Sequence, residues 1–166
     1  MVPLDQRTVL TLLAAAPRRI ARACSDMTDE CLRRKPSVDS CSANEVLAHS
    51  RACAEVWGGS IMAMLTQDGP ALRYISPRSS IKKTNYTGLA FADSFRDYAK
   101  QRKELLNVLR ALGDTDWLRD AAIKAATKHR KETVLSYAQQ MARHQARHCE
   151  QFARILGAAA RKDRSS

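Results

Sequence analysis

Glycine, proline and aromatic residues are scarce in this chain of 166 residues, which has 6 glycines, 5 prolines and 5% aromatic residues. All-β architectures need turn-forming residues at short intervals, so this scarcity favours helices. The 5 cysteines are odd in number and include no Cys-x-x-Cys pair, which argues against a disulfide framework. The longest uncharged run, residues 56–67, is too short to span a bilayer. We therefore expect a cytoplasmic protein with reduced thiols and no membrane segment.

Acidic residues are outnumbered, because the chain has 17 Asp and Glu but 28 Lys and Arg, which gives a net charge of +11. Residues 121–166 alone hold 10 basic residues against 3 acidic ones. Such an excess attracts anionic partners, so a non-enzymatic basic helical module that binds nucleic acid or a protein partner stays open as an alternative function. The basic residues are spread over every segment, however, and no known nucleic-acid-binding motif is present. Nucleic acid is therefore not the partner that we expect.

Apolar residues recur at the helical period in four long segments, at about 5–26, 43–67, 88–112 and 132–160. The second segment has the clearest start, since Ser42 and Glu45 form a capping box in which each side chain binds the other residue's backbone N–H. A short helix is expected over residues 28–34, and Pro17 predicts either a kink in the first helix or the start of a new one. No segment shows the alternation of apolar and polar residues that is typical of a strand. The pattern predicts an all-α four-helix bundle over residues 1–160 with a basic tail at 161–166.

The connection between the second and third segments, residues 68–87, is too long for a tight turn between antiparallel helices. It can instead cross the bundle, so that the two helices it joins run in parallel. We therefore expect an up-down-down-up order, in which the second and fourth helices are antiparallel.

Three of the four histidines interrupt apolar stripes. His49 lies between apolar residues of the second segment, and His144 and His148 lie one helical turn apart on the fourth. A buried imidazole is costly unless its nitrogens find partners, and a divalent metal would satisfy all three rings at once. The alternative is that each ring is hydrogen-bonded in the core. His129, among basic residues, is expected to be solvated.

Residues near this predicted site have two interpretations each. Cys53 follows His49 by one turn and is either a fourth ligand or a small apolar side chain. Gln151, three residues after His148, either supports that ring or is an ordinary polar residue. Arg102, four residues after Tyr98, either contacts an anionic substrate or is simply exposed.

The order and spacing of these residues resemble the DinB/YfiT-like superfamily of small metal-binding helical bundles. Its members carry a serine, a glutamate three residues later and a histidine four residues after that, and their last helix carries His-x-x-x-His-x-x-Gln. The matching residues are Ser42, Glu45, His49, His144, His148 and Gln151. An aromatic residue four positions before an arginine on the third helix is matched by Tyr98 and Arg102. Cys41 departs from the family's tryptophan.

The resemblance implies an up-down-down-up bundle in which His49, His144 and His148 hold zinc, nickel or another divalent metal. It implies substrate binding by Tyr98 and Arg102 and a supporting role for Gln151. From its place one turn after His49, we expect Cys53 to support the site as well. Family members include S-transferases that use a low-molecular-weight thiol, a thiol-dependent isomerase and hydrolases. We therefore expect a metal-dependent transferase or hydrolase that acts on a small, anionic substrate and that can form a homodimer. The sequence identifies no general acid or base.

Overall fold

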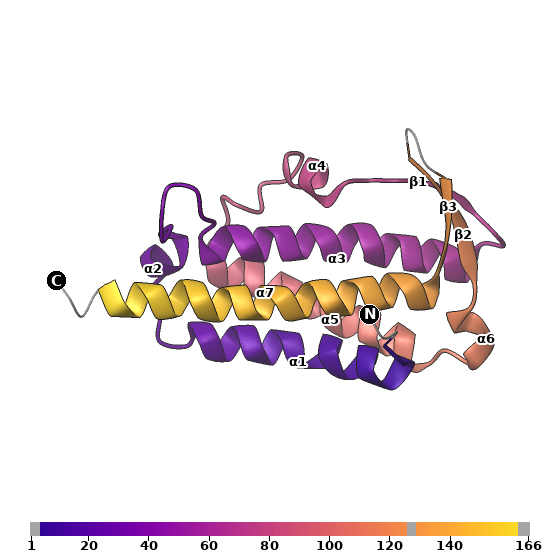
Figure 1. Ribbon diagram of the computed structural model, residues 1–166, viewed down its shortest axis with the longest axis horizontal. Coiled ribbons are helices and arrows are strands. Elements are labelled where there is room, and N and C mark those ends of the chain that lie inside the picture. Colours follow the sequence, from indigo (N-terminus) through magenta and orange to yellow (C-terminus); the bar gives the residue numbers. More distant parts are fainter. Residues whose placement is uncertain (1–3, 126–128, 163–166) are drawn as a thin grey trace.

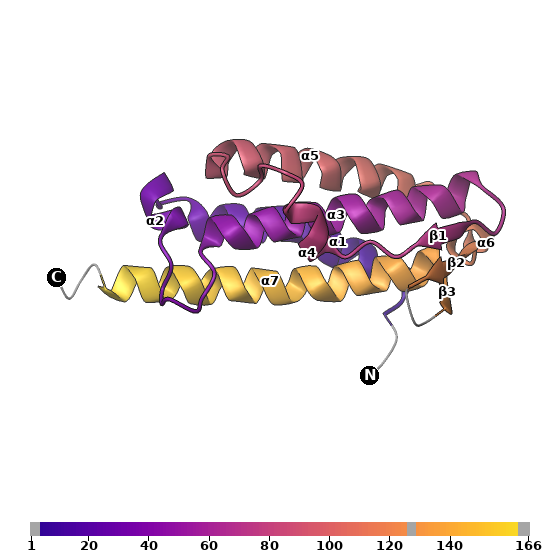
Figure 2. The same cartoon turned by 90° about the horizontal axis from the view of Figure 1, so that it is seen from above.

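Four long helices form a bundle in the computed structural model, which describes residues 4–125 and 129–162 (Figure 1). They are α1 (Gln6–Cys24), α3 (Ala43–Thr66), α5 (Phe91–Arg110) and α7 (Val134–Lys162). Helices α1 and α7 run in one direction along the bundle, and α3 and α5 run in the other (Figure 1, Figure 2). The predicted four-helix bundle with up-down-down-up order is confirmed.

The segment between α3 and α5 is a crossover, as its length predicts. After α3 the chain runs back beside that helix through β1 (Ala71–Arg73) and the short helix α4 (Pro77–Ile81), so that α5 begins near the end of the bundle where α3 begins (Figure 2). Arg51 of α3 then donates to Asp97 and Ser94 of α5, at 2.9 and 3.1 Å. These contacts hold the two parallel helices together.

A small sheet closes the end of the bundle where α7 begins (Figure 1). Strand β1 pairs in parallel with β2 (Asp120–Lys124), and β2 pairs antiparallel with β3 (His129–Thr133). The expectation that the chain has no strand was wrong. Each strand has only 3 to 5 residues, and only β2 has fully buried side chains, so no alternation is visible in the sequence.

The helix boundaries follow from local capping. Helix α1 continues through Pro17 as one helix, and the remaining short helices are α2 (Asp29–Arg33) and α6 (Asp114–Trp117). Helix α7 begins two residues later than expected, because β3 ends at Thr133, whose hydroxyl accepts from the Ser136 N–H at 3.0 Å. Of the tail expected at 161–166, residues 161 and 162 continue α7, and 163–166 lie outside the described residues.

Two clusters of buried apolar side chains fill the bundle, and the predicted metal site lies between them. One cluster includes Leu47 of α3 and Phe152 of α7, and the other includes Trp57 of α3 and Met141 of α7. The histidines lie between these pairs in both helices, and the antiparallel packing of α3 on α7 brings them level. In the described part of the chain, no helix combines the length and hydropathy needed to cross a membrane.

Candidate metal centre

The structure brings the three predicted histidines together from two helices. His144 Nε2 lies 3.1 Å from His49 Nε2 and 3.1 Å from His148 Nε2, so the nitrogens of α3 and α7 face a common centre. All three histidines are half-buried. His129, on β3, is exposed as expected.

The orientation of His148 is fixed by Gln151, one turn further along α7. The Gln151 side-chain oxygen lies 2.9 Å from His148 Nδ1. An amide oxygen only accepts, so Nδ1 carries the proton and the lone pair of the neutral ring is on Nε2, which faces the other histidines. This contact orients the ring as the partners of metal-ligating histidines commonly do.

Burial keeps the three imidazoles neutral. It lowers the pKa of His144 to about 3, with smaller contributions from the neighbouring rings and from Arg147 and Arg102. Burial likewise lowers the pKa of His49 and His148, and Arg78 of α4 adds to the effect on His49. Neutral imidazole is the form that binds a metal, so the rings are in their ligand form at pH 7.

Cys53 is the fourth member of the cluster. Its Sγ lies 3.4 Å from His49 Nε2 and 3.8 Å from His144 Nε2, and the side chain is buried. The donor atoms of His49, Cys53 and His144 all lie within 4.8 Å of one another, and this trio could hold a metal ion. Burial raises the pKa of the Cys53 thiol to about 12, and the positive charge of Arg102 opposes that rise. The structure therefore places Cys53 among the donors and not merely beside them.

Arg102 and Tyr98, predicted to contact substrate, are buried on α5 next to this cluster. Arg102 is only 2% exposed, so the interpretation of it as an exposed surface residue was wrong. Its Nη1 donates to the thioether sulfur of Met141 at 2.7 Å, and no carboxylate pairs with it among the described residues. The Arg102 Nε and the Tyr98 hydroxyl are both buried without a hydrogen-bond partner. A buried guanidinium without a counter-charge is costly and attracts an anion.

Other residues near the histidines were not predicted. The indole of Trp57 packs edge-to-face on His144 with ring centroids 4.9 Å apart, and its place on the apolar stripe of α3 signals only core packing. Arg78 lies in a segment without periodicity, so no sequence signal places it near His49. Glu55, on α3 two residues after Cys53, accepts a hydrogen bond from the Tyr86 hydroxyl at 3.0 Å, and no carboxylate joins the cluster in the described residues.

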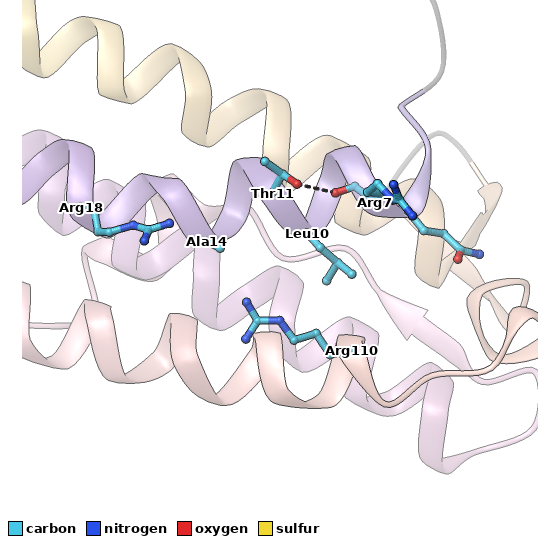
Figure 3. A pocket seen from close by; sticks show the side chains of 7 residues that line it. Arg7, Leu10, Thr11, Ala14, Arg18 and Arg110 are labelled. Carbon is cyan, nitrogen blue, oxygen red and sulfur yellow. Dashed lines mark hydrogen bonds between the residues drawn. The ribbon is translucent and has the colours of Figure 1, made fainter.

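A separate groove lies between α1 and α5, with a volume of about 530 Å³ (Figure 3). Arg7 and Arg18 of α1 and Arg110 of α5 line it, with Leu10 and Ala14 on its apolar wall. None of the histidines contributes to its lining. This groove is therefore a basic surface feature that is distinct from the histidine cluster.

Solved structures share this fold. YfiT from Bacillus subtilis, described as a probable metal-dependent hydrolase with an unusual four-helix bundle topology, is 16% identical with a TM-score of 0.73, over 95% of this chain and 90% of that chain. The mycothiol-dependent maleylpyruvate isomerase is 15% identical with a TM-score of 0.65, over 90% of this chain and 62% of that chain. Among curated proteins, none matches in sequence. The family pattern of the DinB superfamily matches residues 12–152, which hold every residue of the cluster, and the chain belongs to the DinB superfamily.

Proposed function

We propose that this protein is a metal-dependent enzyme in which His49, His144 and His148 bind a divalent metal, zinc or nickel. The observation that carries the proposal is the convergence of their Nε2 atoms, with 3.1 Å between neighbours, from rings that burial keeps neutral. Nitrogen donors of this kind suit both metals. Such a metal lowers the pKa of a bound thiol or water and so makes a nucleophile near neutral pH.

Thiol transfer is the reaction that the surrounding residues favour over hydrolysis. Activation of water needs a base for its proton, and no carboxylate joins the cluster in the described residues. A thiol loses its proton more readily, since its ordinary pKa is about 8.5. Among proteins of this fold, one is described as a probable metal-dependent hydrolase and another as a mycothiol-dependent isomerase, so dependence on a low-molecular-weight thiol occurs on this fold. The proposed co-substrate is therefore a low-molecular-weight thiol.

The second substrate is a small molecule that carries negative charge. Arg102 supports this, because its guanidinium is buried beside the cluster without a carboxylate partner. Tyr98, whose hydroxyl also lacks a partner, is one turn away on the same helix and offers a second donor. A carboxylate or thiolate would satisfy both groups and be held close to the metal.

Metal content of protein purified without an affinity tag tests the binding site. We expect about one equivalent in the wild type, a large loss in His148→Ala and no loss in His129→Ala, since His129 is exposed on β3. Equal content in both variants would contradict the assignment.

A panel assay tests the reaction. Metal-loaded protein is supplied with low-molecular-weight thiols and an anionic electrophile, and in parallel with ester and amide substrates. We expect thiol-dependent turnover that stops when the metal is removed. Metal-dependent hydrolysis that needs no thiol would favour hydrolysis over thiol transfer. Activity that survives metal removal would exclude both metal-dependent reactions.

The groove between α1 and α5 favours a second candidate function, a module that binds a phosphorylated anion. Arg7, Arg18 and Arg110 line the groove, and arginine matches phosphate geometry. Titration with tripolyphosphate tests it, with Arg18→Gln/Arg110→Gln as the variant. Lys103→Gln/Arg154→Gln, which removes the same charge elsewhere, is the matched control. Equal weakening in both pairs would reduce the effect to general electrostatics.

A further inference from the structure

The sulfur of Cys53 lies among the donor nitrogens of His49 and His144. It lies 3.4 Å from His49 Nε2 and 3.8 Å from His144 Nε2, while His144 Nε2 lies 3.1 Å from the nitrogens of His49 and His148. In a tetrahedral zinc site, bonds of about 2.0 Å to nitrogen and about 2.3 Å to sulfur separate neighbouring nitrogens by about 3.3 Å and nitrogen from sulfur by about 3.5 Å. The three separations within the trio of His49, Cys53 and His144 are therefore close to the edges of one coordination tetrahedron, and His148 Nε2 lies 3.1 Å from the His144 corner of that trio.

We propose that Cys53 is a thiolate ligand of the metal, so that the resting centre is closed by three nitrogens and one sulfur. This rests on the proposed metal site but goes beyond it, because three histidines alone leave a position open. The donor atoms of His49, Cys53 and His144 all lie within 4.8 Å of one another, and this trio includes the sulfur. His148 joins it through its contact with His144.

Cys53 would be a thiolate only with a metal bound, because burial raises the pKa of its free thiol to about 12. A metal-bound thiol is deprotonated outright. Arg102 contributes a positive charge that favours the anionic form of Cys53, and its guanidinium has no carboxylate partner among the described residues.

A thiolate ligand also supplies the missing base. If a substrate thiol replaced Cys53 on a bound metal, the metal–sulfur bond to Cys53 would break, a bond to the incoming sulfur would form, and the Cys53 sulfur would take the proton of the incoming thiol. The exchange conserves charge and needs no carboxylate. Water is a much weaker acid than a thiol, so the same exchange with water is far less favourable.

Cobalt substitution tests the ligand directly, with Co²⁺ alone as the probe. Thiolate ligation gives an intense near-ultraviolet charge-transfer band, whereas histidine ligation gives only the weaker visible bands. We expect the charge-transfer band in the wild type and in Cys149→Ala, and its loss in Cys53→Ala and Cys53→Val with the visible bands retained. Cys149 is the matched control, since it is buried on α7 with its sulfur 3.9 Å from the Ala16 carbonyl oxygen.

Each outcome is informative. Visible bands without a charge-transfer band in the wild type, or a band that persists in Cys53→Ala, would overturn the thiolate assignment and leave the histidine site standing. Absence of every cobalt band would overturn both proposals. Zinc competition titrations give a second readout, in which Cys53→Val, whose apolar side chain preserves packing, is expected to lower affinity more than tenfold relative to Cys149→Ala.

Discussion

Replacement of Gln151 by alanine tests whether the histidines form a prepared metal site. The only change at the cluster is the loss of an acceptor 2.9 Å from His148 Nδ1. In the wild type this contact keeps the proton on Nδ1 and leaves the Nε2 lone pair facing His144, 3.1 Å away. Without it the ring can rotate and can move its proton to Nε2, which removes a donor from the centre in part of the population.

The expected magnitude follows from how such supporting contacts act. Loss of a partner that orients a ligating histidine costs about 10- to 100-fold in metal affinity, which corresponds to about 1.4 to 2.7 kcal/mol. The fold itself should be little affected, because Gln151 is partly exposed and its side-chain contact is to His148. Gln151→Glu keeps the acceptor and is expected to retain wild-type affinity.

Competition against a chromophoric chelator measures the zinc affinity of each variant. Gln140→Ala is the matched control, since Gln140 is a half-buried residue of the same helix with no hydrogen bond to the cluster among the described contacts. An unchanged affinity in Gln151→Ala, or an equal loss in Gln140→Ala, would refute the argument that this contact prepares the site.

Three further predictions concern stability. Phe152→Ala removes a fully buried ring and should lower the free energy of unfolding, measured by urea titration, by about 3 to 5 kcal/mol. The control is Val38→Ala at an exposed position, which should lower it by about 0.5 kcal/mol. Equal urea midpoints for the two variants would contradict this prediction. Arg102→Met removes a buried charge and should raise the midpoint of the metal-free protein while raising KM for an anionic substrate, so a lower midpoint would contradict it. Burial lowers the pKa of His144 to about 3, so below about pH 6.5 the unfolded chain binds a proton that the folded cluster excludes. The metal-free protein should therefore lose stability as pH falls from about 6.5 to 5, and His144→Ala should lose it less steeply. A pH-independent midpoint over that window would contradict the last prediction.

The fold was predictable because its signals are local. The capping box of Ser42 and Glu45 forms with distances of 2.8 and 3.2 Å, and it fixes the start of α3 as predicted. The crossover order follows from one length, that of the segment between α3 and α5. The sheet was missed because β1 pairs with residues that follow it by about fifty positions, and no local pattern reports such a pairing.

The residues of the site were predictable to the extent that helix geometry alone positions them. A spacing of four places His144 and His148 on one face, and a spacing of three places Gln151 against His148. The burial of Arg102 also had a signal, since Leu105 follows it by three residues on the same buried stripe of α5. What the sequence could not supply is the distance between helices, and that distance decides whether Cys53 lies among the donors.

The charges at the histidine cluster link the proposed Cys53 ligand to the proposed thiol co-substrate. Neutral imidazoles cancel none of the charge of a divalent metal, and Arg102 adds another positive charge nearby, so the remaining position selects an anion. Cys53 meets that requirement from within the chain, one turn from His49. A ligand that displaces the Cys53 thiolate must bind as an anion and must give its proton to the Cys53 sulfur. A thiol does this more readily than water, because it is the stronger acid. The electrostatic reason for a cysteine ligand is therefore also the reason to expect a thiol co-substrate.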